Sequence, residues 1–109
     1  MTVNQLSETA GFSAVALPQP ERELSGVYIG DLLSWVMGRA REDNAWITIM
    51  SNINVIAVAS LSDVACVVLA EGVALDGDTA AAAAAKGVNV LQSTAPAYET
   101  ALRLHELGV

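Results

Sequence analysis

The sequence predicts one α/β domain with three layers, α/β/α, around a mostly parallel sheet of about five short strands. Two apolar runs, Trp46–Met50 and Ala65–Leu69, end in polar residues, as buried parallel strands do. The segment Asn52–Asp63 between them has the length that a helical crossover needs. Helix-like and strand-like segments then alternate, which favours helices on both faces of the sheet. A chain of 109 residues can bury one core, so we expect a single domain over 1–109.

The first two elements are expected to be a short helix and an edge strand. Apolar residues at helical spacing predict a helix over Val3–Ala10, ended by a left-handed cap at Gly11. The run Phe12–Leu17 alternates apolar and small residues, and Pro18 and Pro20 follow it. Because proline cannot donate to a sheet ladder, this run is predicted to be an edge strand.

A strand over Leu24–Ile29 and a helix from Asp31 to Ala40 come next. Asp31 is placed to cap that helix, since its carboxylate can accept from an unpaired amide of the first turn. The apolar side chains of the helix recur on one stripe, formed by Leu32, Leu33, Val36 and Ala40. This stripe is expected to face the core.

The run Asn52–Ser60 fits either a buried strand or a buried helix by pattern alone. We predict a helix, because Ser51 or Asn52 can cap one and because two parallel strands need a crossover between them.

The last third predicts a helix, a strand and a helix. Six consecutive alanines, Ala80–Ala85, have the highest helix propensity and lie within a predicted helix over Thr79–Gly87. Val88–Leu91 is the predicted last strand. Pro96 is tolerated in the first turn of a final helix that ends at Gly108.

The composition favours self-association and opposes two classes of partner. The chain is 53% hydrophobic and 16% charged, so we expect a homodimer. Its net charge of −7 argues against nucleic acid and membrane surfaces, and no apolar run reaches the length of a membrane span. We therefore expect a cytoplasmic protein. The single cysteine, Cys66, is predicted to be a small core residue. Trp35 and Trp46 are predicted core residues too, although an exposed one would mark a dimer seam.

Polar residues follow each predicted parallel strand, where ligands bind in open α/β sheets. Their hydroxyls, amides and free helix N–H groups would suit an anion or a nucleotide phosphate. Each also suits a cap or a turn. We define the rim as this set of tentative ligand-binding residues: Gly30, Asp31, Ser51, Asn52, Asn54, Glu71, Gly72, Ser93 and Thr94.

No catalytic set is visible in the sequence. The only histidine, His105, lies in the last predicted helix beside an acid, where a solvated position is expected. There is no glycine-rich lysine loop and no Cys/His metal spacing, so we expect no cofactor, no metal and no enzyme. One alternative is a phosphoryl-transfer or hydrolytic enzyme that uses Asp31, Glu71 and the Ser93–Thr94 loop with a divalent ion. Another is a purely structural assembly subunit.

The segment Glu21–Ser34, ERELSGVYIGDLLS, resembles the DRTGG domain, which typically has an Asp-Arg pair, a hydroxyl residue, two glycines and a polar-Asp-Leu-Leu-Ser helix start. Further matches are the AWITI strand, the pair Glu71-Gly72 and the stretch from Leu91 to the end. The resemblance implies a small α/β module related to domains of phosphotransacetylases, of family II pyrophosphatases and of HPr kinase/phosphorylase. Here Glu21, Ser25 and Val27 replace the family's usual Asp, Thr and second Gly. If that glycine serves a ligand, the valine puts the ligand in doubt.

In its relatives this module accompanies enzymes and does not perform their reaction. Together with the missing catalytic set, the resemblance predicts a non-catalytic regulatory or ligand-sensing module. We expect a homodimer. It is expected to bind either a small anionic metabolite or nucleotide at the rim, or a partner enzyme.

Overall fold

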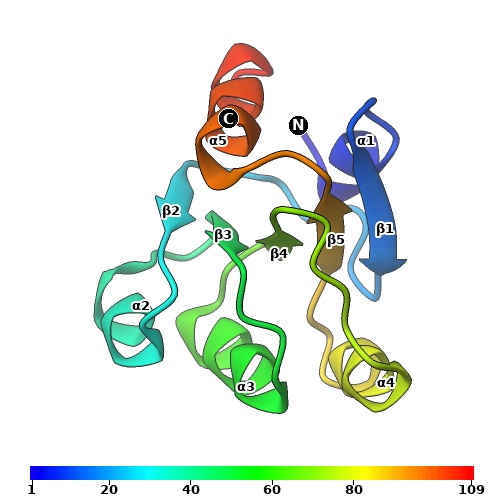
Figure 1. The fold of residues 1–109 in the computed structure, drawn as a ribbon, viewed down its shortest axis with the longest axis vertical. Helices are drawn as coiled ribbons and strands as arrows, with labels where there is room; N and C mark the ends of the chain where they lie inside the picture. Colours follow the sequence, from blue (N-terminus) through cyan, green and yellow to red (C-terminus); the bar gives the residue numbers. More distant parts are fainter.

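The computed structural model describes Met1–Val109 and confirms the predicted fold class. Its five strands form one sheet in the order β1-β5-β4-β3-β2, with β1 antiparallel and the other four parallel (Figure 1). The helices are α1 (Val3–Ser7), α2 (Leu33–Arg39), α3 (Ile53–Ser62), α4 (Gly77–Ala85) and α5 (Ala97–Glu106). The strands are β1 (Phe12–Ala16), β2 (Val27–Ile29), β3 (Ala45–Thr48), β4 (Cys66–Leu69) and β5 (Val90–Ser93).

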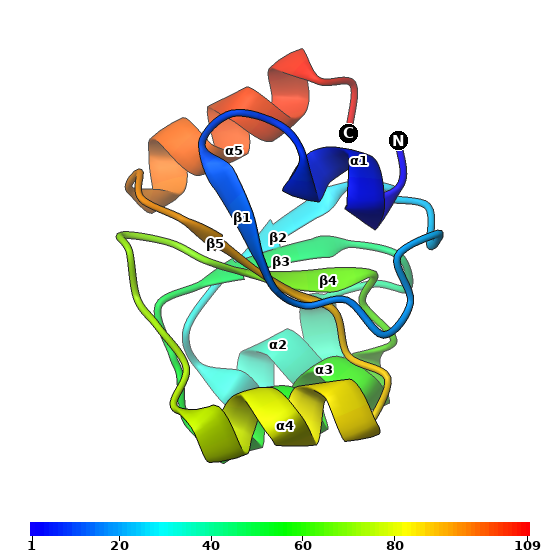
Figure 2. The ribbon, with the colours of Figure 1, turned by 90° about the vertical axis from the view of Figure 1, so that its right-hand side faces the viewer.

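Helices cover both faces of the sheet. Figure 2 shows α1 and α5 above it and α2, α3 and α4 below it. Alternate side chains of the central strands enter two separate cores, so that Trp46 packs on the side of α3 and its neighbour Ile47 on the side of α5. Both faces of β3 and β4 are therefore buried, which explains why their sequences are continuously apolar.

The ambiguous apolar run does form a helix, α3, and its cap is one of the two predicted. The Asn52 side chain accepts from the Asn54 N–H, and the helix ends at Asp63 in the left-handed conformation. The helix, strand and helix of the last third are confirmed as well. The last strand begins at Val90, two residues later than predicted, and α5 begins just after Pro96.

Three predictions near the amino terminus need correction. The first helix ends at Ser7, and Gly11, with φ of 94°, serves the turn into β1. The second strand begins only at Val27, because Gly26 takes a left-handed turn at φ of 79°. Asp31 does not cap α2; Leu32 occupies the N-cap position without any side-chain hydrogen bond.

Candidate functional site

The rim predicted from the sequence exists as one edge of the sheet. Because β2, β3, β4 and β5 are parallel neighbours, the loops that follow them all leave from the same side. The loops after β4 and β5 are at the left in Figure 2. The sheet order divides the rim residues into a β4–β5 half and a β2–β3 half, and the two halves have different surroundings.

The β4–β5 half is fixed by the backbone. Glu71 and Gly72 both adopt left-handed conformations, with φ of 58° and 71°. Their N–H groups turn toward the next loop, where Glu71 donates to the Ala95 carbonyl at 2.9 Å and Gly72 to the Ser93 carbonyl at 2.8 Å. The structure thus brings Glu71, Gly72, Ser93 and Thr94 together.

A cavity of about 310 Å³ opens at the end of β5. We name it the β5 cavity. Its base is the stretch Ser93–Ala95, one wall is the α1–β1 turn, and the other wall is a face of α5. The residues of the two walls are Ala10, Gly11 and Phe12 from the turn, and Glu99, Thr100, Leu102, Arg103 and Glu106 from α5.

Ser93 belongs to the base of this cavity and is not a free loop residue. It is 3% exposed, and its hydroxyl lies 2.9 Å from that of Thr100. The Ala95 N–H also donates to the Ser93 hydroxyl, at 3.2 Å. These bonds hold the start of α5 against β5 and leave Thr94, which is exposed, as the free hydroxyl of this half.

The β2–β3 half is organised by Asp31. The Thr48 hydroxyl and the Ile49 N–H both donate to one Asp31 oxygen, at 2.8 and 3.0 Å. The carboxylate therefore joins the ends of two neighbouring strands, which accounts for its absence from the α2 cap. The neighbouring Gly30 carbonyl accepts from the Trp46 indole N–H at 2.9 Å. A side chain at Gly30 would stand 2.9 Å from the Tyr28 ring, which would have to move to make room for it.

Ser51, Asn52 and Asn54 lie at the start of α3 on this half. Asn52 is engaged as the helix cap, whereas no hydrogen bond involves the Ser51 or Asn54 side chain. Around them the surface is apolar, because four large side chains are about half exposed at the ends of β2 and β3 and the starts of α2 and α3. These are Ile29, Leu32, Ile49 and Ile53.

The rim carries acids but no lysine or arginine in any of its four loops. Asp31 follows β2 and Glu71 follows β4, with β3 between them, so their backbones are about 10 Å apart at the usual strand spacing. No group of three His, Cys, Asp or Glu residues could hold a metal ion. The arrangement does not assemble the two acids that the enzyme alternative requires.

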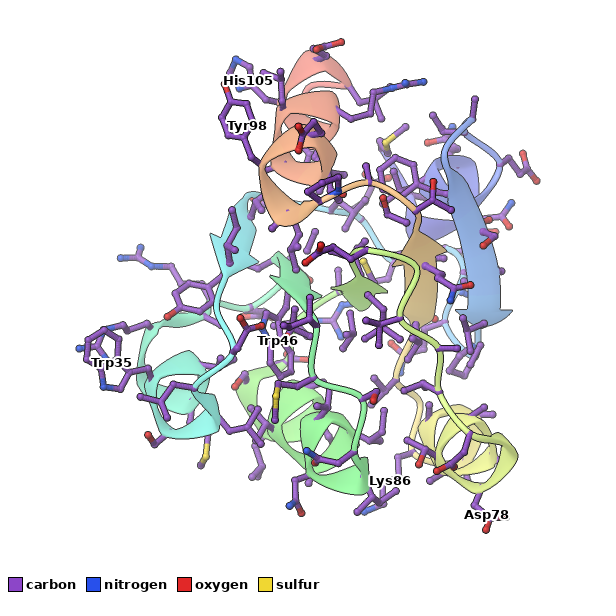
Figure 3. The ribbon with its side chains drawn as sticks, in the orientation of Figure 1. Trp35, Trp46, Asp78, Lys86, Tyr98 and His105 are labelled. Atoms are coloured by element: carbon purple, nitrogen blue, oxygen red, sulfur yellow. The ribbon has the colours of Figure 1, made fainter.

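The other residues weighed for chemistry are placed as follows. Cys66 is fully buried in β4, and burial raises the pKa of its thiol to about 12, so it stays protonated, as a core residue should. His105 is exposed on α5, on the side away from β1 (Figure 3). Trp46 is buried as predicted. Trp35 is not: it is 54% exposed, and the Arg39 guanidinium lies 3.9 Å from its ring centre.

Comparison with known proteins supports the fold. Scans against protein-family models and curated proteins give no match. Among solved structures, the chain is similar to the CBS and DRTGG domains of the regulatory region of Clostridium perfringens pyrophosphatase, crystallised with its activator diadenosine tetraphosphate. The TM-score is 0.71 at 14% identity, over 94% of this chain and 45% of that one. At this identity the likeness concerns the fold, and it supports the DRTGG-like architecture. This chain spans less than half of that structure.

Two further findings bear on the site. No helix of the structure combines the length and apolar character needed to cross a lipid bilayer.

Both walls of the β5 cavity went unpredicted from the sequence, because only residues that directly follow strands were considered for the rim. The alternation of charge at Glu99, Arg103 and Glu106, all on one face of α5, is the signal that would have drawn attention to them.

Proposed function

We propose that this protein is a non-catalytic, DRTGG-like regulatory module that binds a small anionic metabolite or nucleotide at the rim and reports it to a partner enzyme. The observation that carries the proposal is the β5 cavity, which opens beside Glu71 and Thr94 at the carboxyl edge of the sheet. In α/β folds, ligand-binding pockets commonly lie at the carboxyl ends of the parallel strands. The cavity holds no nucleophile activated by a base and no metal cluster.

The fold supports the same proposal. A regulatory region of a pyrophosphatase has this architecture and was crystallised with a nucleotide activator. A regulatory role needs a ligand site, and the β5 cavity is our candidate for it.

Calorimetry and thermal shift with adenine nucleotides, diadenosine tetraphosphate, acetyl phosphate, coenzyme A and small carboxylates test the binding. We expect at least one compound to raise the melting temperature, because a ligand that binds only the folded state stabilises it. Thr94→Val should weaken the binding of that compound. Ser60→Ala is the control and should leave binding unchanged, because the Ser60 hydroxyl is exposed at the end of α3 far from the rim. No response from the whole panel would overturn the binding of an anionic metabolite or nucleotide at the rim.

The absence of catalysis is tested separately. With p-nitrophenyl phosphate and Mg²⁺ we expect no turnover above background, because Asp31 is engaged with Thr48 and is a strand away from Glu71. Turnover that disappears in Asp31→Asn or Glu71→Gln would make the protein an enzyme and contradict the proposal.

We further propose that the protein is a homodimer that joins through β2. This strand is an edge of the sheet. The backbone groups of Gly26 and Gly30 bond to β3, so the alternation of a parallel ladder turns the N–H and C=O groups of Val27 and Ile29 outward. Two outward residues on either side of Tyr28 can pair with the same residues of a second copy about a two-fold axis.

The surface beside β2 fits a second copy in apolarity and in charge. Six of the nine exposed large apolar side chains belong to β2, to α2, or to the residues that lead into α2 and α3: Ile29, Leu32, Trp35, Met37, Ile49 and Ile53. The helix α2 has an acid, Asp31, before its start and a cation, Arg39, at its end, and neither forms an ion pair within the chain. When two copies of α2 pack antiparallel about the same axis, each Asp31 faces the Arg39 of the other copy.

Sedimentation velocity over a range of concentrations tests the dimer. Leu32→Asp should raise the dimer dissociation constant about 100-fold, since it buries an unpaired charge in the interface. Leu61→Asp is the matched control, because Leu61 is even more exposed, at 73%, but lies at the far end of α3. A monomeric wild-type protein, or equal weakening by both variants, would rule out this interface.

A further inference from the structure

The β5 cavity contains the one cation near the rim, and that cation has no partner in the chain. Arg103 lies four residues after Glu99 and three before Glu106, at spacings where helical ion pairs form. Neither glutamate approaches its guanidinium within ion-pair distance, since the only ion pairs of the molecule involve Arg22 and the amino terminus. The α5 wall therefore presents an acid, a cation and an acid, all three free.

This charge pattern selects among anionic ligands. The wall has one positive and two negative groups, so a polyphosphate would gain one favourable charge contact and meet two repulsive ones. A ligand with one carboxylate and one ammonium group matches the pattern, because Arg103 can take the carboxylate with two parallel hydrogen bonds while a glutamate takes the ammonium.

The rest of the cavity fits a small apolar group. Phe12 and Leu102 line it from opposite walls, and the Ser93 and Thr100 hydroxyls at its base already bond to each other. A volume of about 310 Å³ is at the low end for ligand pockets, which suits a molecule of amino-acid size and not a dinucleotide.

We infer that the β5 cavity binds a free α-amino acid with an apolar side chain, held by Arg103 at its carboxylate and by Glu99 or Glu106 at its ammonium group. The inference rests on the proposed function of the rim as a ligand site, and it replaces the anionic metabolite or nucleotide of that proposal with a zwitterion that has one carboxylate. The apolar side chain packs between Phe12 and Leu102, and the free Thr94 hydroxyl, which also lines the cavity, is a further hydrogen-bond donor.

Titrations of the ¹⁵N-labelled protein with L-leucine, L-methionine and L-phenylalanine, followed by two-dimensional NMR and calorimetry, test this inference. The amide signals of Thr94, Glu99 and Arg103 should shift with saturation. The N-acetyl derivative and the amide derivative of the same amino acid should each bind about 10-fold more weakly or worse, because each lacks one of the two charges.

Charge-neutral variants locate the site. Arg103→Gln should weaken binding of the amino acid about 10- to 100-fold, the cost of one charged hydrogen-bonded contact, and so should at least one of Glu99→Gln and Glu106→Gln. Arg41→Gln and Glu42→Gln are matched controls, since both residues are exposed and lie outside the cavity and outside any ion pair. Their affinities should equal that of the wild type.

The outcomes separate this inference from the proposed function. Amino-acid binding that depends on Arg103 supports the inference and the ligand-sensing role, with the amino acid in place of an anionic metabolite or nucleotide. A nucleotide or phosphate that binds while no amino acid does overturns the inference and leaves the proposed function standing. Amino-acid binding that Arg103→Gln and Glu99→Gln leave unchanged overturns the assignment to this cavity. No binding by any compound of either panel overturns both.

Discussion

At the amino end of the parallel strands Asn44 and Asn89 are buried and bonded, whereas at the carboxyl end the side chains of Asn54, Glu71 and Thr94 are exposed and free. Asn89, just before β5, is 2% exposed and makes three hydrogen bonds, to both backbone groups of Gln19 and to the Ala65 carbonyl. Asn44, just before β3, joins the Arg41 N–H to the Ser25 carbonyl in the same way. Each asparagine fastens a distant loop to the start of a strand.

Arg22 completes this amino end. Its guanidinium pairs with Asp43 at 3.0 Å and with Asp63 at 2.8 Å, so that it joins the residues before β3 and β4. Burial acts to lower the pKa of Arg22, but the hydrogen bonds to the two aspartates outweigh it and raise the pKa overall. The cavity at this end is only about 80 Å³, against about 310 Å³ at the other.

The groups that tie distant loops together thus lie at the amino end of the strands, and the proposed ligand site lies at the carboxyl end. The stretch that resembles the DRTGG domain begins at the amino end: Arg22 forms the ion pairs, and a side chain at Gly26 would stand 3.0 Å from the Asn44 amide. Val27 is an ordinary strand residue with no left-handed backbone. Val27 begins β2 and so lies at the amino end of that strand, and substitutions can test the two ends independently.

The largest effect is expected for Asn89→Ala. Removal of its amide leaves the Gln19 N–H and the Gln19 and Ala65 carbonyls without partners, which should lower the free energy of unfolding by about 3 kcal/mol. Asn54→Ala at the rim is the matched control, since that side chain is exposed and unbonded and should change stability by less than about 0.5 kcal/mol. Urea denaturation measures both, and equal losses would end the contrast between the two ends.

Arg22→Met should cost less, about 1–2 kcal/mol, because its partners are 42% and 57% exposed and water screens the pairs. The loss should shrink in high salt. Arg22→Lys should recover less than half of it, because an ammonium group cannot reach Asp43, Asp63 and the Asp63 carbonyl together. Full recovery by lysine would show that charge alone matters at this position.

The fold was predictable because its signals are local. The secondary structure of several elements follows from short stretches of sequence. Examples are the continuous apolar runs of β3 and β4, the alanine helix α4 and the crossover needed at α3. The errors arose where residues far apart in the sequence determine the hydrogen bonding or the burial of a side chain. Asp31 looks like a helix cap in sequence, but Thr48, seventeen positions later, provides the stronger partner. Leu32 was expected on the buried stripe and Trp35 in the core, yet α2 is at the sheet's edge and leaves both exposed.

The candidate site was half predictable for a related reason. Strand ends converge in any parallel sheet, so the rim follows from the fold class alone. The β5 cavity depends on how α5 crosses the sheet and on where the α1–β1 turn ends, and no spacing in the sequence encodes either. Arg103 could not be associated with Phe12 before the tertiary structure brought them to opposite walls.

A smaller effect is expected for Ser93→Ala, the one buried hydroxyl of the rim. It removes the bonds to Thr100 and to the Ala95 N–H, which should lower the free energy of unfolding by about 1 kcal/mol. Thr94→Val, next to it but exposed, should leave stability within about 0.5 kcal/mol. Thermal denaturation of the pair tests whether the free polar groups of the carboxyl end are dispensable for folding. A larger loss for Thr94→Val would contradict this.

The smallest effect is expected at Asp76, the exposed cap of α4 on the carboxyl side of β4. Hydrogen bonds from Thr79, its backbone N–H at 2.7 Å first, lower the pKa of Asp76 in the folded state. A lowered folded pKa means that the carboxylate stabilises the fold at pH values above its unfolded pKa of about 3.9, and that this contribution is lost as the pH falls through the folded pKa. Asn caps a helix equally well but does not titrate. The stability difference between the wild type and Asp76→Asn should therefore be constant from pH 5 to 7 and shrink below about pH 4, whereas a difference that stays the same at pH 3 would show that the carboxylate charge contributes nothing to this cap.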